Sequence, residues 1–94
     1  MPIFAVHYSY SEATVPGRDT YRPEHRAWLG DHLAAGTLLS SGPFADGSGA
    51  LLVFQTADAD ALTALLADDP FAREKLVDHV AVLEWVPVLG AFAS

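Results

Sequence analysis

The chain has 94 residues and a mass of 10.0 kDa, which is enough for one small domain and too little for two domains with separate cores. Five Lys and Arg residues against twelve Asp and Glu leave a formal net charge of −7, which argues against nucleic acid or an anionic membrane surface as a partner. The absence of cysteine excludes disulfides, thiolate catalysis and thiolate-bound metals. No apolar run approaches the roughly 20 residues of a membrane helix and no basic stretch begins the chain, so we expect a cytoplasmic protein.

The first part of the chain predicts a strand, a loop and a helix in that order. Residues 3–10 are rich in β-branched and aromatic side chains, which is typical of a strand. The Pro-Gly pair within residues 11–18 predicts a loop. Residues 21–35 follow a helical repeat, in which Pro23 suits the first turn and Gly36 suits the position just after the last turn.

The rest of the chain predicts three strands and two helices. Asp58 precedes one helix, and Asp69, which is followed by proline, precedes the other, so we expect each aspartate to cap the helix that follows it. In chain order these elements are strands at 37–42 and 50–56, helices at 59–67 and 70–76, and a strand at 78–88.

This order of elements predicts a ferredoxin-like β-α-β-β-α-β domain over residues 1–94. In this α+β fold a four-stranded antiparallel sheet carries its helices on one face. The last strand is apolar on both faces, since Val80 and Val82 alternate with Leu83 and Trp85. Because helices can cover only one of these faces, we expect a second copy of the sheet to cover the other and form a two-fold homodimer.

The most informative polar residue is His25. The helical repeat places it in the middle of the apolar face of the first predicted helix, the face that also carries Trp28, Leu29 and Leu33. A histidine that has lost its solvation needs a partner or a function. Two interpretations stay open: a core histidine bonded to a backbone carbonyl, or an acid–base group. His32 is about 10.5 Å further along the helix axis, too far to share a metal with His25, and no metal site is predicted.

Asp69 is the second candidate. Besides capping a helix, its carboxylate would fix the tautomer of His25 and stabilise its imidazolium form if the two side chains meet. Arg22 lies near the start of the first predicted helix, where it either reaches an anionic substrate or stays in water. The sequence holds no phosphate-binding loop, zinc-protease motif or nucleophile elbow, so no cofactor is predicted.

Four segments together resemble one known family. They are Arg22-Pro23-Glu24-His25 with Trp28-Leu29, then Gly36-Thr37-Leu38-Leu39-Ser40-Ser41-Gly42-Pro43, then Asp69-Pro70-Phe71, and finally Glu84-Trp85-Val86-Pro87-Val88. In order and spacing they are similar to the YciI-like (YCII-related) family, within the dimeric α+β barrel superfamily. The resemblance covers nearly the whole chain and implies a ferredoxin-like fold whose sheets pair into a barrel-like dimer.

The resemblance also implies a pocket in each subunit that holds a His–Asp pair. Carried over to this chain, the pair is His25 and Asp69. A related branch of the family includes a dehydrochlorinase of chlorinated hydroxyquinols, so the resemblance implies acid–base chemistry. The residues we expect to line the pocket are Arg22, Trp28, Ser41, Gly42 and Pro43.

These observations leave two main functions from different classes. The first is a cofactor-free enzyme in which His25 moves a proton on a small aromatic or quinoid molecule, in an elimination or isomerisation, and Asp69 orients the ring. The second is a non-catalytic dimeric module that binds a small ligand or serves as an accessory protein. A third, a metal-dependent oxygenase-like protein, needs a metal site that the spacing does not indicate. The first two differ in whether His25 meets Asp69 at an open cavity or packs against backbone.

Overall fold

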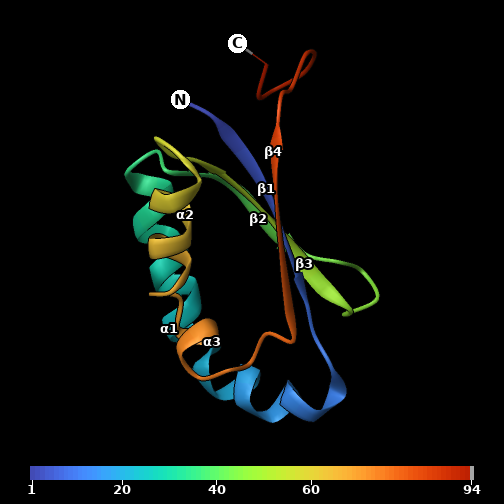
Figure 1. Cartoon of the computed structure of the whole chain (residues 1–94). Helices are drawn as coiled ribbons and strands as arrows, with labels where there is room; N and C mark the ends of the chain where they lie inside the picture. Colours follow the sequence, from blue (N-terminus) through green and yellow to red (C-terminus); the bar gives the residue numbers. More distant parts are fainter. Residues whose placement is uncertain (94) are drawn as a thin grey trace.

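The computed structural model describes residues 1–93 and shows a four-stranded sheet with its helices on one face (Figure 1). In chain order the elements are strand β1 (Ile3–Ser9), the 3₁₀ turn η1 (Glu12–Thr14), helix α1 (Val15–Ala34), strands β2 (Leu38–Pro43) and β3 (Gly49–Gln55), helices α2 (Ala59–Leu66) and α3 (Pro70–Arg73), and strand β4 (His79–Trp85). The strands lie in the order β2-β3-β1-β4, and all neighbours are antiparallel. The predicted ferredoxin-like fold is therefore confirmed. Within the described residues, no helix is both long and apolar enough to cross a membrane.

The hydrophobic core lies between the sheet and the helices. Along β1 the side chains of Phe4, Val6 and Tyr8 are buried on the helix side, because successive side chains of a strand point to opposite faces. Helix α2 buries Leu62 and Leu66 against them. One face of the sheet and the apolar side of α2 thus form the core.

Helix α1 begins earlier than predicted, so the loop predicted over residues 11–18 is wrong from Val15 onward. Pro16 occupies the first turn of α1, where a missing N–H costs nothing, whereas Pro23 lies inside the helix. Gly17 has a packing role here instead of a turn role, since a Cβ at this position would clash with the side chain of Leu76. The early start brings Arg18 into the helix.

The last helix and the last strand are shorter than predicted. Helix α3 ends at Arg73, and β4, an edge strand, ends at Trp85 before Pro87, which has no N–H for a strand ladder. Two predicted helix boundaries are confirmed. Asp58 accepts a hydrogen bond of 2.7 Å from a first-turn N–H of α2, and Gly36 follows α1 with a φ of 80°.

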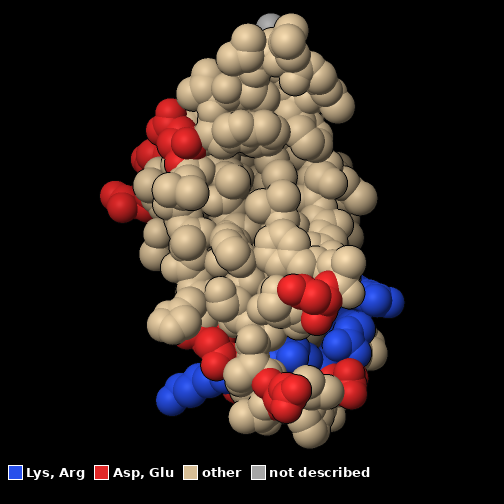
Figure 2. Space-filling view, turned by 90° about the vertical axis from the view of Figure 1, so that its right-hand side faces the viewer, with Lys and Arg blue, Asp and Glu red and all other residues tan. Residues whose placement is uncertain are grey.

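The sheet face opposite the helices is apolar and uncovered in the single chain. Figure 2 looks onto this side of the molecule and shows a broad area without charged side chains. Leu83 on β4 is 66% exposed there, and Leu51 and Trp85 are exposed as well. The chain exposes 5764 Å², about a tenth more than the ~5,200 Å² that size scaling gives for a compact monomer of this mass. One apolar face therefore lacks a covering layer.

Candidate active site

Asp69 lies between α2 and α3 and is completely buried. Its Oδ1 accepts a hydrogen bond of 3.0 Å from the backbone N–H of Phe71, so it is the N-cap of α3, as predicted. Pro70 fits the first helical position because no N–H is needed there. The local sequence that starts a helix therefore also holds a carboxylate inside the protein.

The same carboxylate accepts two further hydrogen bonds from distant parts of the chain. His25 Nδ1 on α1 lies 2.7 Å from Asp69 Oδ1, and the Tyr8 hydroxyl on β1 donates to Oδ2 at 2.8 Å. Among residues 1–93, His25 is the only ionic partner of Asp69. Such a set of donors compensates a buried carboxylate for its lost solvation. Asp69 thus connects β1, α1 and α3 at one point.

The contact with Asp69 determines which nitrogen of His25 carries the proton. A carboxylate only accepts hydrogen bonds, so Nδ1 donates its proton to Asp69, and in the neutral ring Nε2 keeps a free lone pair. The ring of Phe71 stacks on the imidazole with centroids 3.9 Å apart and 4° between the planes, which holds its orientation. His25 is 8% exposed, pairs with a carboxylate instead of a backbone carbonyl, and lines a cavity.

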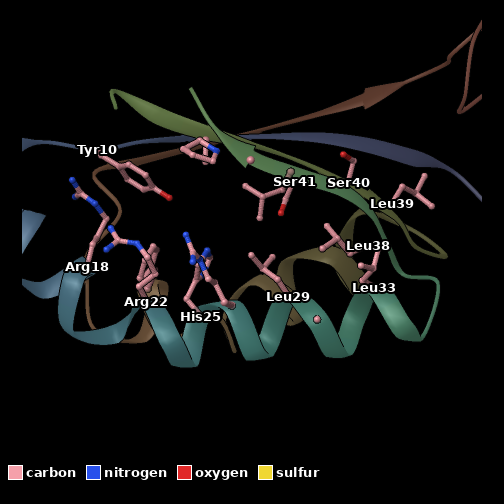
Figure 3. A pocket seen from close by; sticks show the side chains of 17 residues that line it. Tyr10, Arg18, Arg22, His25, Leu29, Leu33, Leu38, Leu39, Ser40 and Ser41 are labelled. Atoms are coloured by element: carbon pink, nitrogen blue, oxygen red, sulfur yellow. The ribbon is translucent and has the colours of Figure 1, made fainter. Parts of the chain in front are cut away.

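This cavity, of about 660 Å³, lies between α1 and the strands β2 and β3 (Figure 3). Its size is in the usual range for small-molecule sites. Four residues expected at the pocket line it: Arg22, Ser41, Gly42 and Pro43. Trp28, the fifth, does not. It turns toward the core, where its ring centroid lies 6.1 Å from that of Phe54, and its Nε1 is buried without a partner among the described residues.

The two ends of the cavity differ in polarity, as Figure 3 shows. Tyr10 and the ionisable side chains gather at one end; they are Arg18, Arg22 and His25. Leu29, Leu33, Leu38 and Leu39 extend toward the other end, where Ser40 and Ser41 also lie. Leu33, expected in the buried face of its helix, is instead 57% exposed and belongs to the leucine end. The space around His25 is thus open to an amphipathic small molecule.

Tyr8 and Arg18 are among the residues of this site that were not predicted, as are Tyr10 and Arg26. The strand pattern already places Tyr8 inside the core, where a phenol needs a hydrogen-bond partner, and this was the available signal. Arg18 falls in the loop predicted from Pro16 and Gly17. Extending the helical period backward from His25 through Arg22 would have placed Arg18 on the same helix face.

The Asp69 carboxylate also affects the two neighbouring tyrosines. Burial, followed by the charge of Asp69 and its hydrogen bond, raises the pKa of Tyr8 far above its usual range. Burial and the same charge raise the pKa of Tyr10 to about 12, against the opposing charges of Arg18 and Arg22. Tyr8 therefore remains a protonated donor to Asp69 throughout the physiological pH range.

A pH dependence of stability follows. In the unfolded chain Tyr8 titrates near its ordinary pKa of 10.0, whereas in the folded chain it keeps its proton. The contribution of Tyr8 to the free energy of unfolding is therefore complete below pH 10. It is lost as the pH rises above 10, by about 1.4 kcal/mol per pH unit. Urea unfolding at a series of alkaline pH values measures this slope. Tyr10, whose pKa is raised to about 12, adds its own loss above pH 10, so Tyr8→Phe is expected to reduce the total slope by the Tyr8 share. An unchanged slope in this variant would contradict the assignment.

Among residues 1–93, no group of three or more His, Asp or Glu side chains is arranged to hold a metal ion.

Comparisons with known proteins agree with this architecture. The sequence profile of the YCII-related domain matches residues 3–86. Among solved structures, 5-chloro-2-hydroxyhydroquinone dehydrochlorinase from Burkholderia phenoliruptrix AC1100, in complex with 2,5-dihydroxybenzoquinone, superimposes with a TM-score of 0.78. It shares 20% sequence identity, over 88% of this chain and 92% of that one.

Two further structures have the same fold. A candidate antibiotic biosynthesis monooxygenase from Bacteroides thetaiotaomicron VPI-5482 has a TM-score of 0.63 and 12% identity, over 99% of this chain and 94% of that one. A NIPSNAP domain protein from Burkholderia xenovorans has a TM-score of 0.57 and 18% sequence identity. The match covers 100% of this chain and 99% of that one. No curated protein matches the sequence. At these identities the likeness to the solved structures shows the fold alone.

Proposed function

Because the chain belongs to the YCII-related family, we propose that it is a small acid–base enzyme that needs no cofactor, with His25 as the group that moves the proton and Asp69 as the group that orients it. The observation that carries the proposal is the 2.7 Å contact between His25 Nδ1 and Asp69 Oδ1 beside an open cavity. A general base needs a free lone pair and a fixed ring, and this contact leaves the lone pair on Nε2 of a residue that lines the cavity.

The pair suits a reaction in which a proton is removed and another group then leaves or a double bond moves. When Nε2 accepts a proton, the ring becomes an imidazolium beside the buried carboxylate of Asp69. The hydrogen bond then becomes an ion pair in a poorly solvated place, where opposite charges attract strongly. Elimination and isomerisation need only a base that takes a proton and returns it.

We further propose a small aromatic or quinoid substrate, on the example of the dehydrochlorinase of the same fold. In such a reaction a proton goes to His25 Nε2 and chloride leaves with the electron pair of the C–Cl bond. The net change is the loss of HCl, and no external oxidant is consumed. The stacked rings of Phe71 and His25 offer a flat wall for a planar ring.

Chloride release from 5-chloro-2-hydroxyhydroquinone tests this proposal. We expect the wild-type protein to release chloride faster than buffer alone, and His25→Gln to release it at the buffer rate. If both proteins release chloride equally and faster than buffer, His25 is not the base. If both release it at the buffer rate, this compound is not a substrate. Binding of the compound without turnover would favour the alternative function, a non-catalytic binding module.

We also propose that two chains pair through their uncovered sheet faces. A second cavity, of about 720 Å³, lies on this side among Ala5, Leu51, Leu83, Trp85 and Phe92. A cavity with apolar walls and an exposed apolar rim is the kind of surface that a second sheet fills. Stable interfaces of this type bury about 1,200–2,000 Å² in total.

Light scattering at micromolar concentration is expected to give a mass near twice 10.0 kDa. Leu83→Asp places a charge on the exposed apolar face of the sheet and is expected to yield single chains. Ala27→Asp, on the exposed side of α1, is the matched control and should leave the mass unchanged. A wild-type mass near 10 kDa would contradict the pairing.

A further inference from the structure

The charges that line the active-site cavity are opposite in sign to the charge of the chain. The chain has twelve acidic and five basic residues, yet Arg18, Arg22 and Arg26 line the cavity and no described Asp or Glu does. The cavity therefore holds three of the five cations of an acidic protein. Such a concentration of positive charge in a concave site favours negatively charged ligands.

Arg18 is the most unusual of these cations because it is buried without a counter-ion. It is 5% exposed, and its guanidinium donates to the Ser11 carbonyl at 3.2 Å, to the Leu76 carbonyl at 3.5 Å and to the Thr14 hydroxyl. Among residues 1–93, no carboxylate lies within ion-pairing distance of it. These neutral oxygens accept hydrogen bonds from some of its N–H groups but do not balance its charge. An unbalanced charge inside a protein raises the free energy of the folded state.

Its surroundings connect Arg18 to the proposed base. The guanidinium lies 4.2 Å from the centroid of the Tyr10 ring, which packs edge-on against Phe71 at 6.2 Å, and Phe71 stacks on His25 at 3.9 Å. The Tyr10 hydroxyl has no protein partner among the described residues and points into the cavity in Figure 3. Arg18, Tyr10 and His25 thus share one wall.

Arg22 makes a different contribution from Arg18. It is paired with Asp19 at 2.7 Å, and the two side chains are 39% and 61% exposed, so its charge is already balanced and partly screened by water. A ligand anion gains most where a cation lacks any partner. This difference assigns the anchoring role to Arg18.

We propose that the cavity binds an amphipathic organic anion, whose acidic group is held by Arg18 and the Tyr10 hydroxyl and whose apolar part lies among the leucines at the other end. The bound anion supplies the counter-charge that Arg18 lacks. The inference rests on the proposed function only where it places the reacting atom of the ligand next to His25. The preference of the cavity for an anion does not require that the protein turns the ligand over.

The test compares two molecules of the same shape and different charge, 4-butylbenzoate and 4-butylbenzamide. Titrations followed by NMR are expected to show that the wild-type protein binds the benzoate at least about tenfold more tightly, because a charge-assisted hydrogen bond is stronger than a neutral one. Arg18→Gln is expected to remove this preference. Arg73→Gln is the matched control, because it loses the same charge from an exposed position outside the cavity and should keep the preference.

Equal binding of the two probes, no binding of the benzoate, or an unchanged preference in Arg18→Gln would each overturn the inference. If Arg18→Gln does not fold, the wild-type protein still provides a test, because the Arg18 Nε–H signal must shift with the benzoate and not with the benzamide. The proposed function fails separately. His25→Gln is expected to keep the preference for the benzoate, so turnover that survives this substitution contradicts the catalytic role of His25 and leaves the anion site intact.

Discussion

Asp69→Ala is expected to lower the free energy of unfolding by about 3–7 kcal/mol. The lost cap of α3 accounts for about 1 kcal/mol of this. The remainder arises because the Tyr8 hydroxyl and His25 Nδ1 both donate to Asp69 inside the protein, and each buried donor left without a partner costs about 1–3 kcal/mol. Small domains are stable by only about 5–15 kcal/mol, so this single change removes much of the stability.

Urea unfolding at one fixed protein concentration measures the effect, with Asp58→Ala as the matched control. Asp58 caps α2 through one hydrogen bond and is exposed, so its replacement reports the loss of a cap alone, about 1 kcal/mol. We expect Asp69→Ala to cost clearly more than Asp58→Ala. Equal losses would mean that the contacts of Asp69 with Tyr8 and His25 contribute nothing to stability.

His25→Gln is expected to lower the turnover rate by about 100- to 10,000-fold, the range that general acid–base catalysis contributes. Glutamine has a similar reach and retains an N–H for Asp69, and its amide has no basic nitrogen that could accept a proton at neutral pH. The fold should therefore persist while the proposed base is lost. Initial rates of chloride release, with unfolding curves on the same samples, measure both effects.

The matched control is His32→Gln, the same substitution on the same helix at a histidine that does not line the cavity. This variant should keep the wild-type rate. A loss of rate equal to that of His25→Gln would point to a general effect on α1, and full activity of His25→Gln would remove the proposed base.

Local signals in the sequence were sufficient for most of the fold. An aspartate followed by proline placed the cap of α3 at Asp69, and the β-branched and aromatic residues of 3–10 indicated the strand β1. The start of α1 was missed because Pro16 and Gly17 are also turn residues. Pro16 suits the first turn of a helix as well as a turn, and Gly17 packs against Leu76, which lies far along the chain.

The candidate site was less accessible to local reasoning, because its contacts join distant residues. His25 and Asp69 are separated by 44 positions, and only the family resemblance indicated that they form a pair. Tyr8 and Asp69 are separated by 61 positions, and nothing in either local sequence indicates their hydrogen bond. Trp28 shares the helix of His25 but turns toward Phe54, which shows that proximity in sequence does not place a residue in the cavity.

The position of the ring proton of His25 tests the central claim most directly, and it requires no substrate. A long-range ¹H–¹⁵N correlation spectrum, recorded at a pH where the ring is neutral, distinguishes the two tautomers. The 2.7 Å contact with Asp69 predicts a protonated Nδ1 and a bare Nε2 on a ring that lines the cavity. A proton on Nε2 would contradict the account, because His25 would then have no lone pair to offer to a substrate in the cavity.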